Sequence, residues 1–338
     1  MLMEKESTAP LSFNKDLITA AFLDPSGKAV EKPIEIRTNP ITGRTCRITF
    51  AREGEKEPGA EKLPPPPPDA DNTADCPFCM PRALTKTPIL NPRIAIQGRM
   101  SYGKSLLFPN LFPYGSFSAV SLFDDMHFVE IGMADPSSYA DSFKNCSRYL
   151  KKIIHTSQQY RYMAITQNHL PSAGGSLVHP HLQIQADRVP ANYHRFLEKR
   201  AGEYFRETGR YIFSDYLTFE KKNKARYIGR TGDWEWMAAF APEGFYEIWA
   251  ILPGRFSLAR LGDKHFEELA IGILNSQRFY RSLNRNGYNL GILSVEDEKR
   301  SFLELRCTIV VRSNYSAWTR NDHSGFEVML GDMATFSS

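Results

Sequence analysis

The ten residues 176–185, Ser-Leu-Val-His-Pro-His-Leu-Gln-Ile-Gln, constrain the fold of this chain more than any other stretch. If the stretch is a β-strand, its side chains alternate between the two faces of a sheet. One face then carries imidazoles and amides, from His179, His181, Gln183 and Gln185. The other face carries Pro180, Leu182 and Ile184. This alternation predicts a strand whose apolar face is anchored in a core and whose polar face meets a polar partner. The alternative is an edge strand with a solvated polar face.

A flexible turn, Gly174-Gly175-Ser176, comes directly before the predicted strand. Glycines let backbone N–H groups approach a ligand closely, and successive N–H groups suit phosphate oxygens. A neutral imidazole can serve as a nucleophile, a general base or a metal ligand. His181 lies in the middle of the strand, where its ring can be held rigidly. Gln183 on the same face can donate an amide N–H to a phosphoryl oxygen.

His-Pro-His-x-Gln, with a Gly-x-Ser element whose serine lies three residues before the first histidine, resembles the active-site strand of the galactose-1-phosphate uridylyltransferases. These enzymes form a branch of the histidine-triad superfamily of nucleotide hydrolases and transferases. The resemblance implies an α+β fold, internally duplicated and histidine-triad-like, with antiparallel sheets and flanking helices. It covers most of the chain, is strongest around Cys76, Cys79 and residues 179–183, and weakens after Asp187.

Composition is that of an ordinary soluble globular protein, because 42% of the 338 residues are apolar and 24% are charged. The formal charge of +4, without a long basic run, argues against a dedicated nucleic-acid binder. No apolar run approaches the roughly 20 residues that span a bilayer, and the N-terminus lacks the pattern of a signal peptide. Five cysteines are too few, and odd in number, for a disulfide framework. We therefore expect a cytoplasmic protein with neither membrane nor nucleic acid as partner.

A Cys-x-x-Cys pair, Cys76 and Cys79, predicts half of a zinc site in a reducing compartment. A redox dithiol is the rival, although the pair follows a loop and does not open a thioredoxin-like helix. The resemblance implies that His127 and His179 complete a closed structural site, which would pin the active strand beside His181. The alternative is two buried free cysteines and an ordinary core histidine.

The resemblance also implies contacts with a nucleotide. Asn-Pro-x-Thr-Gly at residues 39–43 is similar to an element near the start of the family, and Arg52 matches a downstream arginine that approaches the phosphates. Asn110 matches an asparagine that holds the nucleoside, and Asn168 matches one that hydrogen-bonds the reacting phosphoryl group. Leu111 stands where the family often has an acidic residue, which leaves the choice between uracil and adenine open. A solvated arginine and a turn-capping asparagine are the alternatives for the first two contacts.

The order strand–helix–strand–strand occurs twice, over residues 116–187 and 246–312, as an internal duplication would produce. Aligning the two passes pairs the two histidines of His-Pro-His with Glu304 and Arg306, so the second copy lacks the histidine chemistry. The second half also lacks the extra histidine pair with which well-known family members bind another metal. Its residues 325–332 only loosely resemble the segment that grips the hexose.

We therefore expect a catalytic half with the zinc site, residues 1–187, and a degenerate histidine-triad-like half, residues 188–338. Residues 1 to about 30 carry little pattern and are expected to form an arm or an early strand. Asp135-Pro136 is expected to start a helix. The buried face of this helix is predicted to consist of Tyr139, Phe143, Cys146, Leu150 and Ile153.

The function implied is nucleotidyl transfer by double displacement, in which His181 attacks the α-phosphorus of a nucleoside diphosphate sugar. A carbonyl of His179 or Pro180 is expected to fix the tautomer of the ring. Gln183, Ser176 and the amides of Gly174 and Gly175 would stabilise the nonbridging oxygens.

Three functions fit these residues. The first is a UDP-glucose–hexose-1-phosphate uridylyltransferase of galactose metabolism. The second is a nucleotide-sugar or dinucleotide phosphorylase, such as an ADP-glucose phosphorylase, with phosphate as the acceptor. The third is a zinc-stabilised nucleotide-binding protein without catalysis. The family often forms dimers that complete each other's sites, so a homodimer is a further implication of the resemblance.

Overall fold

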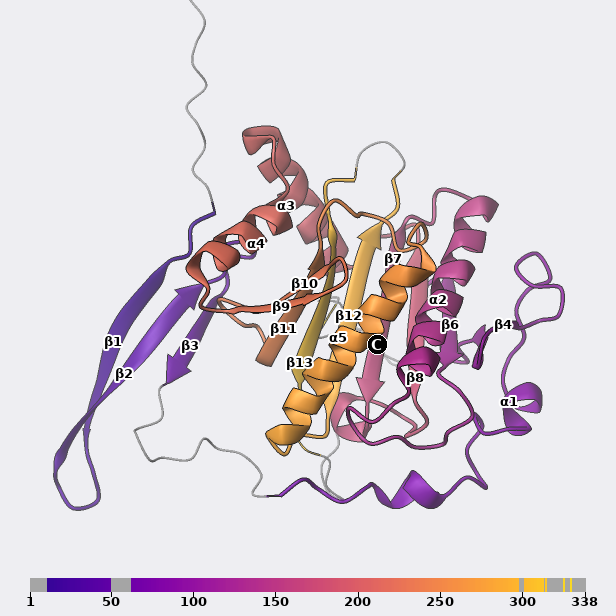
Figure 1. Ribbon diagram of the computed structural model, residues 1–338, viewed down its shortest axis with the longest axis horizontal. Helices are drawn as coiled ribbons and strands as arrows, with labels where there is room; N and C mark the ends of the chain where they lie inside the picture. Colours follow the sequence, from indigo (N-terminus) through magenta and orange to yellow (C-terminus); the bar gives the residue numbers. More distant parts are fainter. Residues whose placement is uncertain are drawn as a thin grey trace, which may run out of the picture.

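The structure, a computed structural model, describes residues 11–49, 62–297 and 301–312, together with Asn314, Gly325 and Met329. A ten-stranded sheet forms the body of this described part (Figure 1). In spatial order its strands are β4 (Met100–Tyr102), β5 (Ser105–Pro109), β6 (Phe117–Leu122), β8 (His181–Asp187), β7 (Tyr162–His169), β12 (Tyr288–Val295), β13 (Leu305–Val311), β11 (Phe245–Leu252), β10 (Trp234–Ala238) and β9 (Tyr227–Thr231). All pairings among them are antiparallel, so the α+β class with antiparallel sheets is confirmed.

The sheet contains the same strand order twice, read inward from each edge. The order β4-β5-β6-β8-β7 on one side matches β9-β10-β11-β13-β12 on the other, and the two sets meet where β7 pairs with β12. A long helix connects corresponding strands in each set: α2 (Pro136–Thr156) follows β6, and α5 (Asp263–Ser282) follows β11. This order agrees with the expected repeat, while the division into residues 1–187 and 188–338 stays a prediction.

Helix α2 begins and packs as its sequence indicates. Asp135 is the N-cap, and its carboxylate accepts a hydrogen bond from the backbone N–H of Ser137 at 3.0 Å. Pro136 follows at the first helical position, where its missing N–H costs nothing. The five side chains predicted to form the apolar face are all buried, which confirms that prediction.

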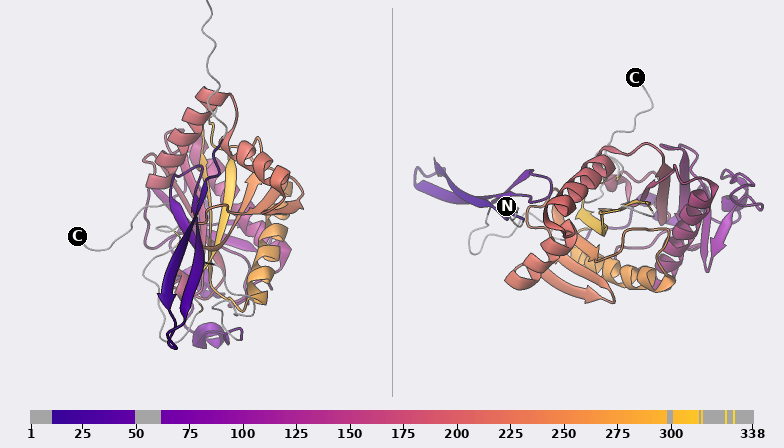
Figure 2. Two further views of the ribbon diagram at one scale, coloured as in Figure 1. Left: turned by 90° about the vertical axis from the view of Figure 1, so that its left-hand side faces the viewer. Right: turned by 90° about the horizontal axis from the view of Figure 1, so that it is seen from above.

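The two faces of the sheet are covered differently. Helices α2 and α5 lie side by side over one face and share the main core with Leu182, Ile184 and Leu290 from the central strands (Figure 1). The opposite face is covered over the second half by α3 (Asn192–Thr208) and α4 (Ile212–Asn223), which enclose a second core (Figure 2). Over the first half, this opposite face carries the His-Pro-His segment and the Cys-x-x-Cys loop.

A separate three-stranded sheet projects from the body beside the second half (Figures 1 and 2). It consists of β1 (Lys15–Leu23), β2 (Ala29–Thr38) and β3 (Thr45–Thr49). The turn between β2 and β3 is held by Glu243, whose carboxylate accepts from Thr42 Oγ1 at 2.7 Å and from Arg44 at 2.9 Å. The Asn-Pro-x-Thr-Gly element at residues 39–43 therefore docks on the second half.

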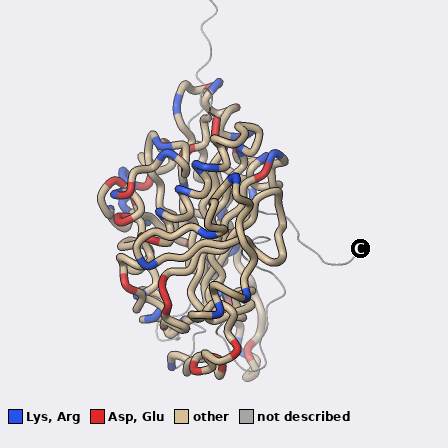
Figure 3. Tube along the Cα trace, turned by 90° about the vertical axis from the view of Figure 1, so that its right-hand side faces the viewer, with Lys and Arg blue, Asp and Glu red and all other residues tan. Residues whose placement is uncertain are grey.

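The remaining elements are short. They are the 3-10 turns η1 (Pro68–Asp71) and η2 (Pro171–Ala173) and the one-turn helix α1 (Arg82–Thr85). On the side shown in Figure 3, basic and acidic residues are interspersed. No helix in the described ranges is both long enough and apolar enough to cross a membrane.

Candidate functional site

The active strand predicted from residue 176 is shorter than expected, because β8 begins only at His181. Pro180 has no N–H to donate to a neighbouring strand, and its carbonyl accepts a hydrogen bond from Phe123 N at 3.3 Å. Residues 176–180 are therefore a connecting segment rather than a strand. From His181 onward the predicted alternation holds: Leu182 and Ile184 are fully buried under α2, and Gln183 faces the other side.

The turn before this segment already uses the two amides that were expected to bind phosphate. Gly174 N donates to the carbonyl of Pro171, and Gly175 N donates to that of Leu170, both at 3.0 Å. Gly174 has a φ of 83°, which favours glycine, and a Cβ at Gly175 would lie 3.0 Å from the Leu170 oxygen. In this structure the glycines shape the turn, so the Ser176 hydroxyl and the Gln183 amide are the better candidates for phosphate contacts.

The His181 ring is buried and held in one orientation. Only 5% of the residue is exposed, and burial lowers the pKa of the imidazole. Nδ1 lies 2.8 Å from the carbonyl oxygen of His179, which is one of the two carbonyls expected to fix the tautomer. The Phe78 ring packs edge-on against it with centroids 5.3 Å apart. The ring therefore has a fixed position and a protonated Nδ1.

The four predicted metal ligands converge beside His181. One ligand atom each from Cys76, Cys79, His127 and His179 lies within 4.8 Å of all the others. Cys79 is central, because its Sγ lies 3.2 Å from Nδ1 of His127 and 3.6 Å from Nδ1 of His179. Burial, with the neighbouring Cys76 thiol, raises the pKa of Cys79 to about 11, which a bound cation would offset by favouring the thiolate.

Both histidines of this cluster present the same nitrogen to the thiols. Nε2 of His127 lies 2.8 Å from the carbonyl of Asp69, and Nε2 of His179 lies 3.3 Å from that of Asp124. A carbonyl only accepts, so each Nε2 carries the proton and each Nδ1 faces the cluster with its lone pair. Two thiols and two such nitrogens are the donor set of a closed zinc site, so the residues fit a structural metal.

The structure describes two of the residues predicted to contact the substrate, Asn168 and Asn110, and their surroundings differ. Asn168, at the end of β7, lies on the same sheet face as His181, and only 7% of it is exposed. Asn110 Oδ1 accepts a hydrogen bond from Phe112 N at 3.1 Å, which is the turn-capping alternative, although no described residue accepts from its N–H₂ group. The next two side chains, Leu111 and Phe112, are 64% and 60% exposed. Arg52 lies outside the described residues.

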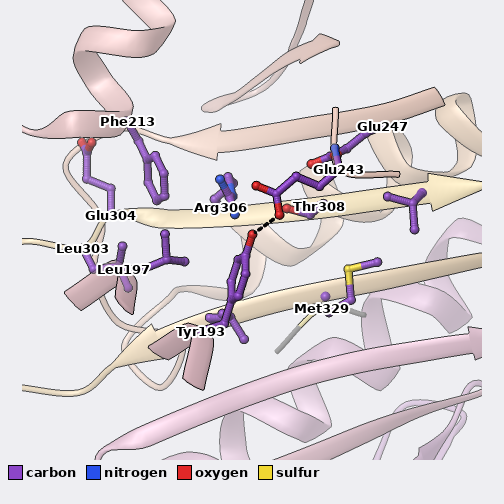
Figure 4. A pocket seen from close by; sticks show the side chains of 13 residues that line it. Tyr193, Leu197, Phe213, Glu243, Glu247, Leu303, Glu304, Arg306, Thr308 and Met329 are labelled. Carbon is purple, nitrogen blue, oxygen red and sulfur yellow. Dashed lines mark hydrogen bonds between the residues drawn. The ribbon is translucent and has the colours of Figure 1, made fainter. Parts of the chain in front are cut away.

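The same face of the second half holds a small pocket of about 50 Å³ that the sequence did not predict (Figure 4). Arg306, the counterpart of His181, lies over the rings of Trp249 and Phe213 at 4.2 and 4.8 Å. Glu304, the counterpart of His179, accepts from Ser214 N, Ser214 Oγ and Gly254 N at 2.8, 2.6 and 2.8 Å. At these positions the second half has a hydrogen-bonded carboxylate and a stacked guanidinium in place of two imidazoles.

Comparison with known proteins adds two relatives by sequence, although no protein-family model matches the chain. An uncharacterised protein of Archaeoglobus fulgidus is 29% identical over 309 residues, which are 91% of this chain and 89% of that protein. The ADP-glucose phosphorylase of Arabidopsis thaliana is 26% identical over 242 residues, which are 64% of this chain and 65%, just under two thirds, of that protein.

Solved structures with a similar fold again include the ADP-glucose phosphorylase. The Arabidopsis thaliana ADP-glucose phosphorylase with bound ADP-glucose superposes with a TM-score of 0.63 at 22% identity, covering 88% of this chain and 94% of that one. A uridylyltransferase mutant superposes with a TM-score of 0.60 at 16% identity, covering 89% and 93%. The relatives named here by activity are an ADP-glucose phosphorylase and a uridylyltransferase. This chain therefore has the same fold as the ADP-glucose phosphorylase and uridylyltransferase structures, on a divergent sequence.

Proposed function

We propose that the protein transfers a nucleoside monophosphate from a nucleotide sugar to a phosphorylated acceptor through His181. The observation that carries this proposal is the 2.8 Å contact between His181 Nδ1 and the carbonyl of His179. Because the carbonyl can only accept, the ring proton is on Nδ1 and the lone pair is on Nε2. Among the described residues Nε2 has no hydrogen-bond partner, so it is available as a nucleophile.

The reaction is a double displacement. Nε2 attacks the α-phosphorus, and the N–P bond forms as the P–O bond to the sugar phosphate breaks, releasing sugar 1-phosphate. The Nδ1 proton stays on the ring, whose positive charge is stabilised by the His179 carbonyl. A phosphate oxygen of the acceptor then attacks the same phosphorus, the N–P bond breaks and His181 is restored. Splitting one difficult displacement into two easier ones is the advantage of such covalent catalysis.

Three side chains would stabilise the nonbridging oxygens of the reacting phosphoryl group. Gln183 lies two residues after His181 on the same face of β8, and the carboxamide of Asn168 lies on that face of β7. The Ser176 hydroxyl, at the start of the connecting segment, is exposed. Removal of one such donor typically lowers a rate by about 10²–10³.

The Cys/His cluster is proposed to hold a structural zinc ion. Its four protein ligands would leave no position open for substrate, so the metal would tie the loops of Cys76–Cys79 and His127 to the segment before β8. That tie fixes His179, whose carbonyl in turn orients His181.

Two donor and acceptor pairs suit this chemistry. One is UDP-glucose with galactose 1-phosphate, and the other is ADP-glucose with inorganic phosphate. The sequence relationship to an ADP-glucose phosphorylase and the exposed Leu111, where the uridylyltransferases often have an acidic residue, favour the second pair. The predicted kinetics are ping-pong for either pair.

The test is the mass of the intact protein after brief incubation with ADP-glucose or with UDP-glucose, under conditions that preserve phosphoramidates. A gain of one AMP or one UMP would name the base. His181→Ala should abolish the gain. His194→Ala is the matched control, because His194 is equally buried and its Nε2 is also hydrogen-bonded to a backbone carbonyl, that of Met163 at 2.9 Å.

The acceptor is then identified by adding inorganic phosphate, glucose 1-phosphate or galactose 1-phosphate to the isolated adduct. Glucose 1-phosphate, the leaving group of the first step, should discharge the adduct by reversing that step and is the positive control. Of inorganic phosphate and galactose 1-phosphate, only the true acceptor should discharge the adduct rapidly. Tight nucleotide binding without an adduct from either donor would refute the proposal in favour of a non-catalytic binding protein. An adduct that persists in His181→Ala would place the covalent bond on another residue.

A further inference from the structure

The carboxamide of Asn168 is held by the second half of the chain. Its Oδ1 accepts from Asn289 Nδ2 at 2.8 Å and from the backbone N–H of Gly325 at 2.7 Å. Asn289 lies on β12, directly opposite Asn168 in the β7–β12 pairing, and it is fully buried. Two donors from distant parts of the sequence thus occupy the acceptor side of one amide.

The orientation of both amides follows from Arg312, just after β13. Its guanidinium donates to Asn289 Oδ1 at 2.6 Å, and a guanidinium has no acceptor atom. The atom of Asn289 that faces Arg312 must therefore be the oxygen, so its N–H₂ group points the other way, to Asn168. The backbone N–H of Gly325 imposes the same choice on Asn168 independently. The usual ambiguity between amide oxygen and nitrogen is thereby removed.

The N–H₂ group of Asn168 consequently points away from these partners. It has no hydrogen-bond partner among the described residues. The β7–β8 register pairs Thr166 with Gln183, and two residues further along it would bring Asn168 opposite His181. Both side chains lie on the same face, where cross-strand neighbours are close enough to act on one group.

We propose that Asn289 and Arg312 are positioning residues, which orient the Asn168 amide so that its N–H₂ group faces the phosphoryl group at His181. This inference rests on the proposed function. Asn289 Nδ2 also lies 2.8 Å from the Ala173 carbonyl, so the same side chain fixes the turn that precedes Ser176. The half of the chain without the histidines thus supplies the support for a substrate-binding residue of the other half.

Asn289→Asp is the most conservative substitution that changes the orientation of the Asn168 amide without changing the packing at residue 289. An aspartate has nearly the same shape and still accepts from Arg312, but it cannot donate to Asn168 Oδ1. With the carboxylate in place, Asn168 Oδ1 would face a negatively charged oxygen. Relief of that repulsion and a charge-assisted hydrogen bond to the carboxylate outweigh the single neutral hydrogen bond from Gly325 N, so the amide turns and the donor facing His181 is lost. We expect Asn289→Asp and Asn289→Ala each to slow nucleotidylation of His181 by about 10²-fold, which is also the effect expected of Asn168→Ala.

A double-mutant cycle distinguishes positioning from a merely structural role. The measurement is the single-turnover rate of adduct formation, by rapid quench, with the donor that labels the parent protein. If Asn289 acts through Asn168, the double variant Asn168→Ala/Asn289→Ala is no more than a few-fold slower than Asn168→Ala alone. Asn145→Ala is the matched control. Asn145 is equally buried, and its Nδ2 donates to oxygens of Met100 and Ser105 on the opposite face of the sheet.

Three results would overturn the positioning role. Independent effects, with the double variant about 10⁴-fold slower, would overturn the positioning role. It would also be overturned if Asn289→Asp kept the parent rate, or if Asn145→Ala slowed adduct formation as strongly. These results leave the proposed function intact, because the parent protein still forms the adduct. If the parent forms no adduct with either donor, the proposed function and the positioning role fail together.

Discussion

Replacing Cys79 by serine should remove the metal and slow the chemistry at His181 as well. Cys79 Sγ lies 3.2 Å from Nδ1 of His127 and 3.6 Å from Nδ1 of His179, so the substitution removes the sulfur that contacts both histidines of the cluster. If the free metal concentration in the assay exceeds the dissociation constant 1,000-fold, bound metal contributes about 4 kcal/mol to the free energy of unfolding, and for a chain of 338 residues its loss lowers Tm by about 6 °C. Without the metal, His179 is no longer fixed, and the carbonyl that orients His181 becomes free to move. We expect adduct formation to slow by about 10–100-fold.

The assay combines metal content by mass spectrometry of the purified protein, Tm and the rate of adduct formation. Cys146→Ser is the matched control, because Cys146 is a fully buried thiol in α2 whose removal leaves the cluster intact. This control should keep one zinc per chain and the parent rate. A Cys79→Ser protein with a full complement of zinc would refute the assignment of the ligands. A metal-free protein with an unchanged rate would refute the link between the metal and His181.

Three further substitutions test the packing of the second half and its contact with Asn168. Glu304→Ala leaves the two donors of Ser214 and that of Gly254 without an acceptor, and each orphaned group costs about 1–3 kcal/mol, so urea unfolding should show a large loss of stability; an unchanged midpoint would contradict this. Gly272→Ala places a Cβ 1.9 Å from Trp236 Cζ2, so α5 must shift at a cost of about 1–3 kcal/mol, and a variant as stable as the parent would show that the helix has room. Gly325→Ala places a Cβ 2.6 Å from Asn168 Oδ1 and should slow adduct formation more than it lowers Tm; the reverse pattern would argue against contact with Asn168.

Local pattern was enough to predict the elements whose own sequence determines them. Asp135-Pro136 starts α2 through a side-chain cap, and its apolar residues recur at helical spacing. The strand after His181 shows the expected alternation for the same reason. The predicted start of β8 was wrong by five residues. The alternation of polar and apolar residues continues back through Pro180, but the backbone pairing begins only at His181.

Other parts of the structure depend on contacts that no local pattern contains. The hairpin of β1 and β2 has mostly exposed side chains, so it lacks the periodic burial by which strands are recognised. The metal cluster could be anticipated only because the family resemblance supplied two histidines far from Cys-x-x-Cys. The support for Asn168 comes from residues 121 and 157 positions away, and nothing in the local sequence of β12 marks Asn289 as anything but a buried amide.

The two halves hold their corresponding strands β8 and β13 in different ways. In the first half the segment before β8 carries His179, one of four convergent Cys and His side chains that could hold a metal ion. In the second half the corresponding segment before β13 is tethered by Glu304, whose buried carboxylate accepts three hydrogen bonds. Each arrangement satisfies a polar group that would be costly to bury alone. The carboxylate achieves this through hydrogen bonds within the protein alone, whereas the four side chains around His179 have the donor set of a metal site, and the proposed role of Asn289 would link the second half to the site of the first.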